Sequence, residues 1–264
     1  MKDMTATEIG KRLVEAFHLN CRPLCVFGTE DIDEGKVTLG KVDRCVARAI
    51  YTLSAKKDTP AFYFGKEARD GVCGGGQGWL GLVQTPPKLK YLISSGSPDF
   101  MNGAAEYLKA EPDMAERFFQ APGKITPPAR FMNFAAYDQL TGNENVLSWI
   151  FFGTAEQVRN LGGLIHFRSE DIFTSILIPG GPTCASLVTY AAGMSENAPK
   201  NSSYVGPVDP TGNEWFPEDM ISLSVPVHIA QRMAEDIDTS FISKRPGVAM
   251  PSMRLGFGEK GAHF

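Results

Sequence analysis

The sequence predicts an α/β to α+β fold in which helices flank a mixed sheet. Short apolar runs of strand length alternate along the chain with amphipathic helical patterns, an order typical of these classes. The chain has 264 residues, of which 43% are hydrophobic and 21% are charged, an ordinary composition for a soluble globular protein. We therefore expect a single domain over residues 1–264, long enough to bury a substantial core.

The first elements are predicted by helix caps and apolar runs. Thr5 and Glu8 have the spacing of a capping box, and apolar residues then recur on one helical face as far as Phe17. Asp43 is placed to cap a second helix. The elements predicted after the first helix are a strand at 23–27, a helix at 43–55 and a strand at 61–65.

The middle of the chain is predicted to contain a glycine-rich loop and then a mixture of elements. The loop is the run Cys-Gly-Gly-Gly-Gln-Gly-Trp-Leu-Gly at 73–81. Pro112 stands at a natural helix start, and several prolines mark a loop or linker at 121–130. The elements expected between these loops are a strand at 91–95 and helices at 104–110 and 113–120.

The second half repeats the alternation of strands and helices. Thr154 and Gln157 form another capping-box pattern, whose helix is expected to stop near Gly162 and Gly163. Beyond Lys244 the chain is rich in glycine and proline, which predicts an ordered arm or a frayed tail. The other predicted elements are strands at 146–152, 173–178 and 220–225, and helices at 185–192 and 227–237.

A weak internal repeat is visible when the predicted helices that begin at Cys45 and Cys184 are aligned with each other. Tyrosines and prolines then follow at equal distances in the two copies, and Tyr-Phe-Gly at 63–65 is echoed by Tyr-Val-Gly at 204–206. If the repeat is a true duplication, the domain consists of two related halves, 1–125 and 126–264. Two half-sites would then face one pocket.

Charge and cysteine usage limit the classes of partner. A net charge of -4 gives no electrostatic reason to expect nucleic acid or an anionic membrane surface. No run of signal-peptide or membrane-spanning type is visible, and five cysteines are an odd number for a disulfide framework. We expect a cytoplasmic protein whose partners are a small-molecule ligand or a redox partner protein, and a homo-oligomer stays open.

The glycine run is a candidate binding element. Residues 76–81 fit the dinucleotide pattern G-x-G-x-x-G, but the preceding strand ends too early and Pro86 stops any long helix after it. Consecutive glycines can instead present several backbone N–H groups to an anion or cofactor, with Trp79 as an apolar wall. The alternative is a tight crossing of two backbones with Trp79 in the core.

Three cysteines are candidate metal ligands. Cys45 and Cys184 are each predicted in the first turn of a helix, where the dipole favours a thiolate, and Arg44 and Arg48 add positive charge near Cys45. With Cys73 in the glycine loop, three thiolates could converge on a soft metal or an iron–sulfur cluster. Their spacing matches no compact metal motif, and Cys25 is expected to be a core residue.

Histidines and acidic residues are weaker candidates. His228 stands near a helix start and could serve as an axial ligand or an acid/base, although a half-exposed surface position is the simpler expectation. His166 lies in a strand-like stretch, and the sequence contains no zinc-protease or hydrolase motif. The acidic cluster at 209–219 is as well explained by a solvated loop as by a catalytic pair.

Several of these features together resemble a known family. They are Pro23 in a first strand, Cys45 opening an alanine-rich helix, Cys-Gly-Gly at 73–75 with Leu-Gly at 80–81, and Cys184 followed by a Pro-Glu-Asp segment. Over roughly residues 16–242 the chain resembles the ArCR group, a domain-of-unknown-function family found largely in archaea and anaerobic bacteria. The resemblance implies no activity, but the distribution of the family favours oxygen-sensitive cofactors. Members often carry a further cysteine and arginine in the second half, where this chain has Gly-Pro-Val-Asp at 206–209.

The first functional hypothesis is therefore a cofactor-binding protein of anaerobic metabolism that holds an iron–sulfur cluster. Cys45, Cys73 and Cys184 would be the ligands, and the other cofactor contacts are assigned to Gly74, Gly75, Gly76, Gly78, Trp79 and Arg48. A second hypothesis is a ligand-binding or sensor protein for an organic anion or a tetrapyrrole, with structural cysteines. A third is a thiol-dependent enzyme that uses Cys73. The sequence names no catalytic residue and no reaction.

Overall fold

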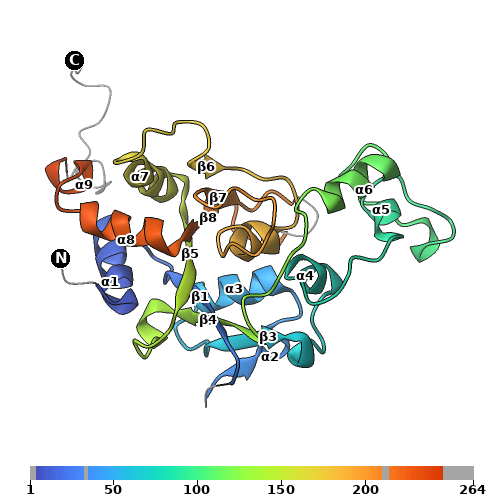
Figure 1. Cartoon of the computed structure of the whole chain (residues 1–264), viewed down its shortest axis with the longest axis horizontal. Coiled ribbons are helices and arrows are strands. Elements are labelled where there is room, and N and C mark those ends of the chain that lie inside the picture. The colour runs from blue at the N-terminus through green and yellow to red at the C-terminus, as the bar shows by residue number, and fades with distance from the viewer. Residues whose placement is uncertain (1–3, 33–34, 210–213, 246–264) are drawn as a thin grey trace.

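The computed structural model describes residues 4–32, 35–209 and 214–245, and a mixed sheet of eight strands runs through this part of the chain (Figure 1). The strands are β1 (Leu24–Thr29), β2 (Val37–Thr38), β3 (Phe62–Gly65), β4 (Phe131–Ala136), β5 (Val146–Thr154), β6 (Ile176–Leu177), β7 (Ser203–Gly206) and β8 (Met220–Pro226). The α-helices are α1 (Ala6–Phe17), α2 (Leu39–Val42), α3 (Val46–Ala55), α4 (Gly74–Trp79), α5 (Leu89–Leu92), α6 (Pro112–Gln120), α7 (Ala155–His166), α8 (Val227–Asp236) and α9 (Phe241–Lys244). Short helical turns are η1 (Lys66–Ala68), η2 (Met101–Gly103), η3 (Tyr137–Gln139) and the π-helical η4 (Ala185–Thr189).

The two halves of the sheet have the same topology, because β1-β4-β3-β2 on one side of the centre correspond to β5-β8-β7-β6 on the other. Across the sheet the order is β2-β3-β4-β1-β5-β8-β7-β6, with β1 and β5 antiparallel in the middle. On each side the next two pairings are antiparallel and the outermost pairing is parallel. The mixed sheet with flanking helices confirms the predicted fold class.

The strands that the internal repeat matches occupy equivalent places in this sheet. β3 and β7 are each third in their set of four, and each follows the helix that begins at Cys45 or Cys184. The symmetry of the strand order separates β1–β4 from β5–β8, which places the division of the chain between Ala136 and Val146. A duplication of the sequence, with halves 1–125 and 126–264, stays a prediction.

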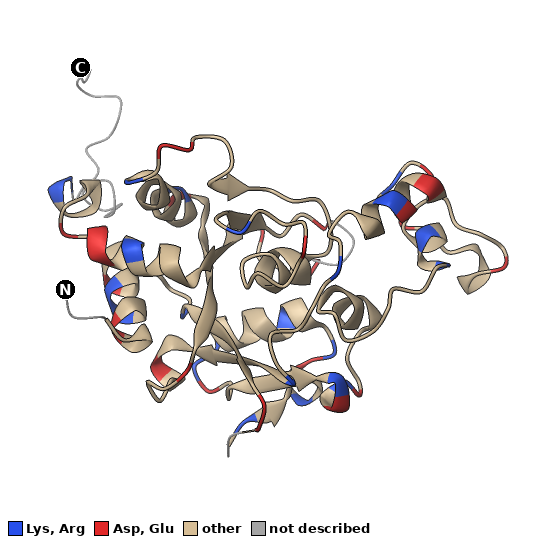
Figure 2. Ribbon diagram, viewed as in Figure 1, with Lys and Arg blue, Asp and Glu red and all other residues tan. Residues whose placement is uncertain are grey.

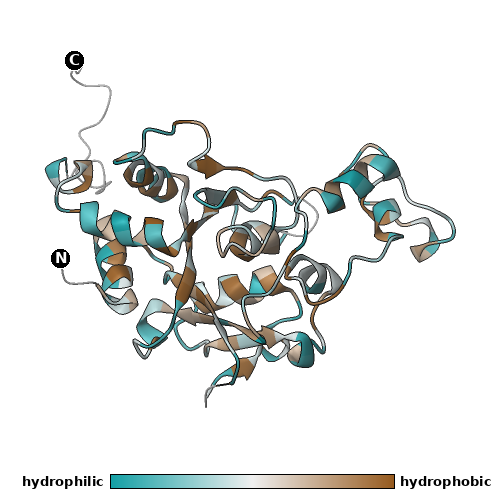
Figure 3. Cartoon of the chain, viewed as in Figure 1, coloured by the Kyte–Doolittle hydropathy of each residue, from teal (hydrophilic) through white to brown (hydrophobic). Residues whose placement is uncertain are grey.

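The sheet separates two apolar cores. Alternate residues of a strand point to opposite faces, so Leu24 and Val26 of β1 enter one core while Cys25 and Phe27 enter the other. The first core also takes side chains of α2, α3, α4 and η4, whereas the second takes side chains of α1, α7, α8 and α9. Hydrophobic residues concentrate in the central strands, while the helices carry both polar and apolar positions (Figure 3). Cys25 is completely buried, as expected of a core residue.

Both predicted capping boxes are confirmed. The Thr5 hydroxyl accepts the Glu8 N–H at 3.2 Å at the start of α1, and the Thr154 hydroxyl accepts the Gln157 N–H at 3.3 Å at the start of α7. The predicted end of the second helix is wrong, because α7 continues past its two glycines to His166. Those glycines are needed for packing: a Cβ on Gly163 would lie 3.0 Å from the ring of Phe241.

Most of the predicted strands and helices outside residues 73–110 are confirmed within a few residues, but β4 was missed. The strand predicted at 173–178 is shorter in the structure, where only the two residues of β6 form it. Predicted strand 91–95 is wrong, because this segment contains the end of α5 and the turns that follow it. Predicted helix 104–110 is also wrong, since Tyr107 has a φ of 53°, which a right-handed helix does not accept. The predicted tail beyond Lys244 falls largely outside the described residues.

Residues 83–120, which we call the arm, project from the main part of the molecule (Figure 1). The arm contains α5, η2 and α6, and only two of its residues, Ser94 and Ala115, are buried. Its helix α6 carries charges of both signs, while α4, at the base of the arm, carries none (Figure 2). Within the described residues, no helix is both long enough and apolar enough to cross a membrane.

Candidate functional site

Cys45 and Cys73 meet where two helices begin. Cys45 is the N-cap residue of α3 and Cys73 is the N-cap residue of α4. The backbone N–H of Cys73 donates to the carbonyl of Arg44 at 2.8 Å, which holds the two cysteine backbones side by side. The Cys45 thiol donates a hydrogen bond to the sulfur of Cys73. The two sulfur atoms therefore form a pair, which we call the dithiol.

The two thiols of the dithiol differ in acidity. The hydrogen bond from Cys45 is the main cause that lowers the pKa of Cys73 to about 6, and the backbone N–H groups of Gly76 and Val46 add to it. The same hydrogen bond, together with burial, raises the pKa of Cys45 far above its ordinary value. Near neutral pH the pair thus holds one proton, on Cys45, and one negative charge, on Cys73. The expectation that the start of α3 makes Cys45 the thiolate is wrong, because the hydrogen bond to Cys73 and burial raise the pKa of Cys45 more than the N–H groups of Ala47 and Arg48 lower it.

The glycine run is a helix rather than the predicted loop. Gln77 stabilises its start, since its side-chain amide donates to the carbonyl of Val72 at 2.8 Å. At its end the hydroxyl of Thr189 in η4 donates to the carbonyl of Trp79 at 2.6 Å. These contacts offset the roughly 1 kcal/mol that each glycine costs inside a helix.

The glycines of α4 fall into two groups. A Cβ on Gly76 would lie 2.4 Å from Val46 and 3.1 Å from the sulfur of Cys73, so only glycine lets α4 approach α3 and the thiolate. A Cβ on Gly74 or Gly75 would meet no atom within 4 Å. Gly78 is intermediate, with the Thr85 hydroxyl 3.3 Å from the same point. Packing within the protein therefore requires glycine at position 76. At Gly74 and Gly75 no packing contact requires glycine, and the backbone faces open space.

Trp79 belongs to a cluster of three rings. It is only 6% exposed, and its ring centroid lies 5.7 Å from that of Phe118 and 6.3 Å from that of Phe119. Both phenylalanines belong to α6, so this cluster attaches the arm to α4. Trp79 is thus both a core residue and the contact through which the arm meets the glycine helix.

Cys184, the third predicted ligand, is buried directly before η4. Burial raises its pKa to about 12, and the negative charges of Cys73 and Asp209 contribute to the shift. Cys184 therefore lies close enough to Cys73 for the negative charge of Cys73 to raise its pKa. Within residues 4–32, 35–209 and 214–245, however, no three His, Cys, Asp or Glu side chains are grouped closely enough to hold a metal ion.

A cleft opens between α4 and the arm. It has a volume of about 600 Å³, which is within the usual size range of small-molecule sites. The main part of the chain contributes Gly75 and Trp79 of α4, and also residues 180–182 and 208–209. The arm contributes Leu92, Phe118 and other residues of α5, α6 and the segment 106–109. Gly75, which lines the cleft, is two residues from Cys73 in the sequence.

The family model for DUF169, described as uncharacterised ArCR, matches residues 12–236, which is most of the chain. The chain belongs to this family. The matched region includes the dithiol, Cys184 and the whole arm, so every part of the site described above belongs to the DUF169 domain. No curated protein and no solved structure matches the chain.

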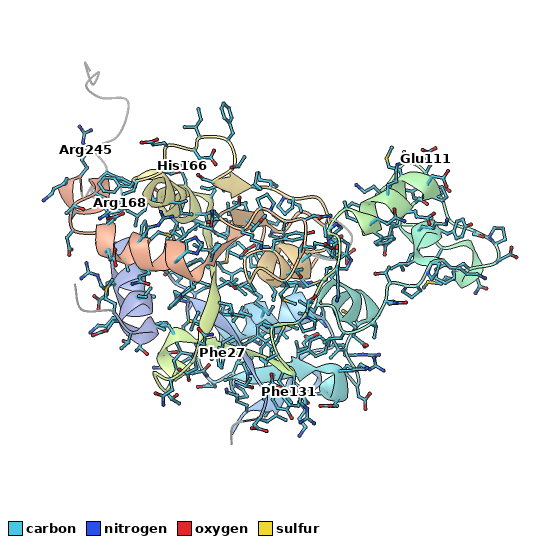
Figure 4. All side chains as sticks on the ribbon, in the orientation of Figure 1. Phe27, Glu111, Phe131, His166, Arg168 and Arg245 are labelled. Atoms are coloured by element: carbon cyan, nitrogen blue, oxygen red, sulfur yellow. The ribbon has the colours of Figure 1, made fainter. Side chains whose placement is uncertain are left out.

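Other predicted residues of this DUF169 domain lie away from the dithiol or are engaged elsewhere. The guanidinium of Arg48 makes two bonds to Asp43, at 2.6 Å from Nε and 2.9 Å from Nη2, and the same carboxylate accepts the N–H of Cys45 at 2.8 Å. His228 is exposed on α8, on the opposite face of the sheet. His166 ends α7 instead of lying in a strand, at the far side of the molecule from Glu111 of the arm (Figure 4).

Sequence reasoning missed the aromatic residues of the arm and the role of Asp43. Phe118 and Phe119 end an amphipathic helix, so their pattern indicated burial but not the partner that buries them. Asp43 was expected only as a helix cap, yet it fixes Arg48 and the amide of Cys45 together. Two adjacent phenylalanines at the end of a helix rich in charged residues are the sequence signal that this end of the arm contacts another part of the protein.

Proposed function

We propose that the protein is a thiol-dependent redox protein whose reactive group is the dithiol of Cys45 and Cys73. The observation that carries the proposal is the meeting of Cys45 and Cys73 at the starts of α3 and α4, where the Cys73 N–H donates to the carbonyl of Arg44 at 2.8 Å. The interaction between the two thiols lowers the pKa of Cys73 to about 6. A thiol of this pKa is largely ionised at neutral pH, and thiol–disulfide exchange requires the thiolate. Cys73 is also exposed, so a substrate can reach it, while Cys45 is half-buried behind it.

The chemistry that this arrangement favours is the reduction of a substrate disulfide. The Cys73 thiolate attacks one sulfur of that disulfide, a bond forms between Cys73 and the substrate, and the other substrate sulfur leaves as a thiolate. Cys45 then transfers its proton to the first released substrate thiolate and attacks the sulfur of Cys73, which releases the second substrate sulfur as a thiolate. Two electrons pass from the dithiol to the substrate, and the protein is left with a disulfide between Cys45 and Cys73.

The experiment treats the reduced protein with oxidised glutathione and follows its mass and its free thiols. We expect the wild-type protein to lose two of its five thiols and to form one internal disulfide, located by peptide mass analysis. In the variant Cys45→Ser the reaction should stop at a mixed disulfide between glutathione and Cys73. The proposal is wrong if Cys73 of that variant reacts no faster than the buried Cys21 and Cys25.

An iron–sulfur cluster held by Cys45, Cys73 and Cys184 is a second candidate. It is favoured by one observation, which is that Cys184 lies near enough to Cys73 for their charges to interact. Three cysteine ligands would leave one position of a cluster open, and the N–H groups near Cys73 would donate to its sulfur atoms. Such a cluster requires Cys184 to move toward the dithiol, because the described side chains are not grouped as a metal site.

Anaerobic purification separates the two candidates. Iron and acid-labile sulfide in stoichiometric amounts, with visible absorbance that is lost in the variant Cys184→Ala, would support the cluster. A colourless protein without iron, whose Cys45 and Cys73 exchange with glutathione as described, would exclude the cluster and support the dithiol.

A further inference from the structure

The cleft between α4 and the arm has walls that differ in kind. On the side of the main domain, Gly75 and Gly180 both line the cleft, and a Cβ on either would meet no atom within 4 Å. Their backbones are therefore uncovered, and no packing contact at that point requires glycine. On the side of the arm the wall is apolar and aromatic, with Leu92, Phe118 and Phe119. Trp79, Pro182 and Val208 add apolar surface to the wall of the main domain, so a ring system in the cleft meets apolar surface on both sides.

An aromatic cluster joins the two walls of the cleft, because Trp79 belongs to α4 whereas Phe118 and Phe119 belong to α6. The rings of Trp79, Phe118 and Phe119 lie within 6.3 Å of one another, centroid to centroid. The ammonium of Lys109 lies 4.2 Å from the centroid of Phe118, where it meets the negative face of the ring. The three rings are inclined to one another by 49–53°, and a ligand ring can add offset-stacked or edge-to-face contacts with them.

The charges around the cleft are of both signs. Lys109 is positive, whereas Glu106 and Asp209 are negative, and both carboxylates interact with other groups of the protein. The helix α4 contributes no charge. These charges leave the cleft with no net attraction to an anion and with a single net negative charge toward a cation, so recognition comes mainly from apolar and aromatic contact.

We propose that this cleft binds a flat, mainly uncharged ligand of two or more fused or conjugated rings, stacked between the glycine backbone and the aromatic wall of the arm. The volume of about 600 Å³ accommodates a molecule of this class. The site lies beside the dithiol but does not depend on its chemistry. A bound ring system would also join the arm to the main domain through contacts on both walls.

The first test measures shape selectivity with Nile red, a flat and uncharged dye whose fluorescence rises in apolar surroundings. Dye bound to the reduced wild-type protein is displaced with 2-naphthol or with 1-adamantanol, which have ten carbon atoms each but differ in thickness. We expect 2-naphthol to displace the dye at roughly tenfold lower concentration, since aromatic contacts add about 0.5–1.5 kcal/mol each. Equal displacement by the two alcohols would overturn the proposal.

The second test locates the site with variants that fill it. Gly75→Leu and Gly180→Leu add a side chain where the protein leaves space, and each should weaken Nile red binding by about tenfold or more, with no loss of thermal stability. Lys11→Leu is the control, because Lys11 is exposed on α1 on the other face of the sheet and adds the same side chain far from the cleft. Unchanged binding in both glycine variants would overturn the proposal. Neither test needs a free thiol, so their failure leaves the dithiol untouched, and failure of glutathione exchange leaves the cleft untouched.

Discussion

Replacing Cys45 by alanine should make Cys73 a weaker acid. The hydrogen bond from the Cys45 thiol is the largest cause that lowers the pKa of Cys73 to about 6, and alanine removes it. A hydrogen bond to a charged group contributes about 1.5–3 kcal/mol, and the exposure of Cys73 reduces this to about half through solvent screening. Since about 1.4 kcal/mol corresponds to one pKa unit, the pKa of Cys73 should rise to roughly 7.

The assay is the rate of alkylation by iodoacetamide between pH 4.5 and 10, with the modified residue identified by peptide mass analysis. At pH 6 the thiolate fraction falls from about one half to about one tenth, so the variant should react about fivefold more slowly. At pH 9 both proteins are fully ionised, and the variant should be slightly faster because a more basic thiolate is a better nucleophile. The midpoint of the profile, rather than a single rate, is therefore the quantity to compare.

The variant Cys45→Ser serves as the control for this experiment. A hydroxyl at the same place can still donate to the thiolate, so its midpoint should lie between those of the wild type and of Cys45→Ala. A midpoint that stays near the wild-type value in Cys45→Ala would refute the reasoning. It would mean that the N–H groups of Gly76 and Val46 stabilise the thiolate without help from Cys45.

Two further predictions concern stability. Gly76→Ala should lower the free energy of unfolding in urea by about 1–3 kcal/mol, because its Cβ would overlap Val46, whereas Gly75→Ala should raise it by about 0.5–1 kcal/mol through helix propensity alone. The second prediction concerns the difference in free energy of unfolding between the wild type and a double variant, Cys45→Ser with Cys73→Ser. This difference should rise from about pH 6 to about pH 9, because over this range the unfolded chain binds two protons at these thiols and the native pair binds one. Above pH 9 the difference should fall, since the raised pKa of Cys45 keeps one proton on the native pair that the unfolded chain has lost; a difference that does not change with pH would contradict the pKa values on which the dithiol proposal depends.

The strands and capped helices of this fold could be predicted because their signals are local. The capping boxes at Thr5 and Thr154 need only four consecutive residues, and both helices begin where these signals place them. The apolar runs of β1, β5 and β8 are long enough to distinguish a buried strand from a loop. Strand β4 was missed because it contains Asn133, whose buried side-chain amide group donates to the hydroxyl of Thr29 in the neighbouring strand, a partner that the sequence does not reveal.

The elements between residues 73 and 110 could not be predicted because their conformation depends on distant partners. Six residues with four glycines have no intrinsic preference for a helix, and α4 forms because Gln77 and Thr189 hold its two ends. Residues 83–110 of the arm contain one buried residue, Ser94, so neither helix nor strand periodicity applies to this segment. Its attachment through Phe118 and Phe119 to Trp79 is a contact across the fold that no window of sequence contains.

The same distinction explains why the sequence favoured a thiolate at Cys45, whereas the fold raises the pKa of Cys45 and lowers that of Cys73. From the sequence, Cys45 had the helix start and two nearby arginines, while Cys73 had only a loop. In the fold, Asp43 takes the guanidinium of Arg48, and the first N–H of α3 donates to Cys73. Gly76 adds a second N–H at a distance that only a residue without a Cβ permits. Cys45 also accepts N–H groups, from Ala47 and Arg48, but its thiol is the donor in the bond to Cys73, which is the largest cause of both pKa shifts. The glycine run matters because Gly76 lets α4 bring a further N–H to Cys73.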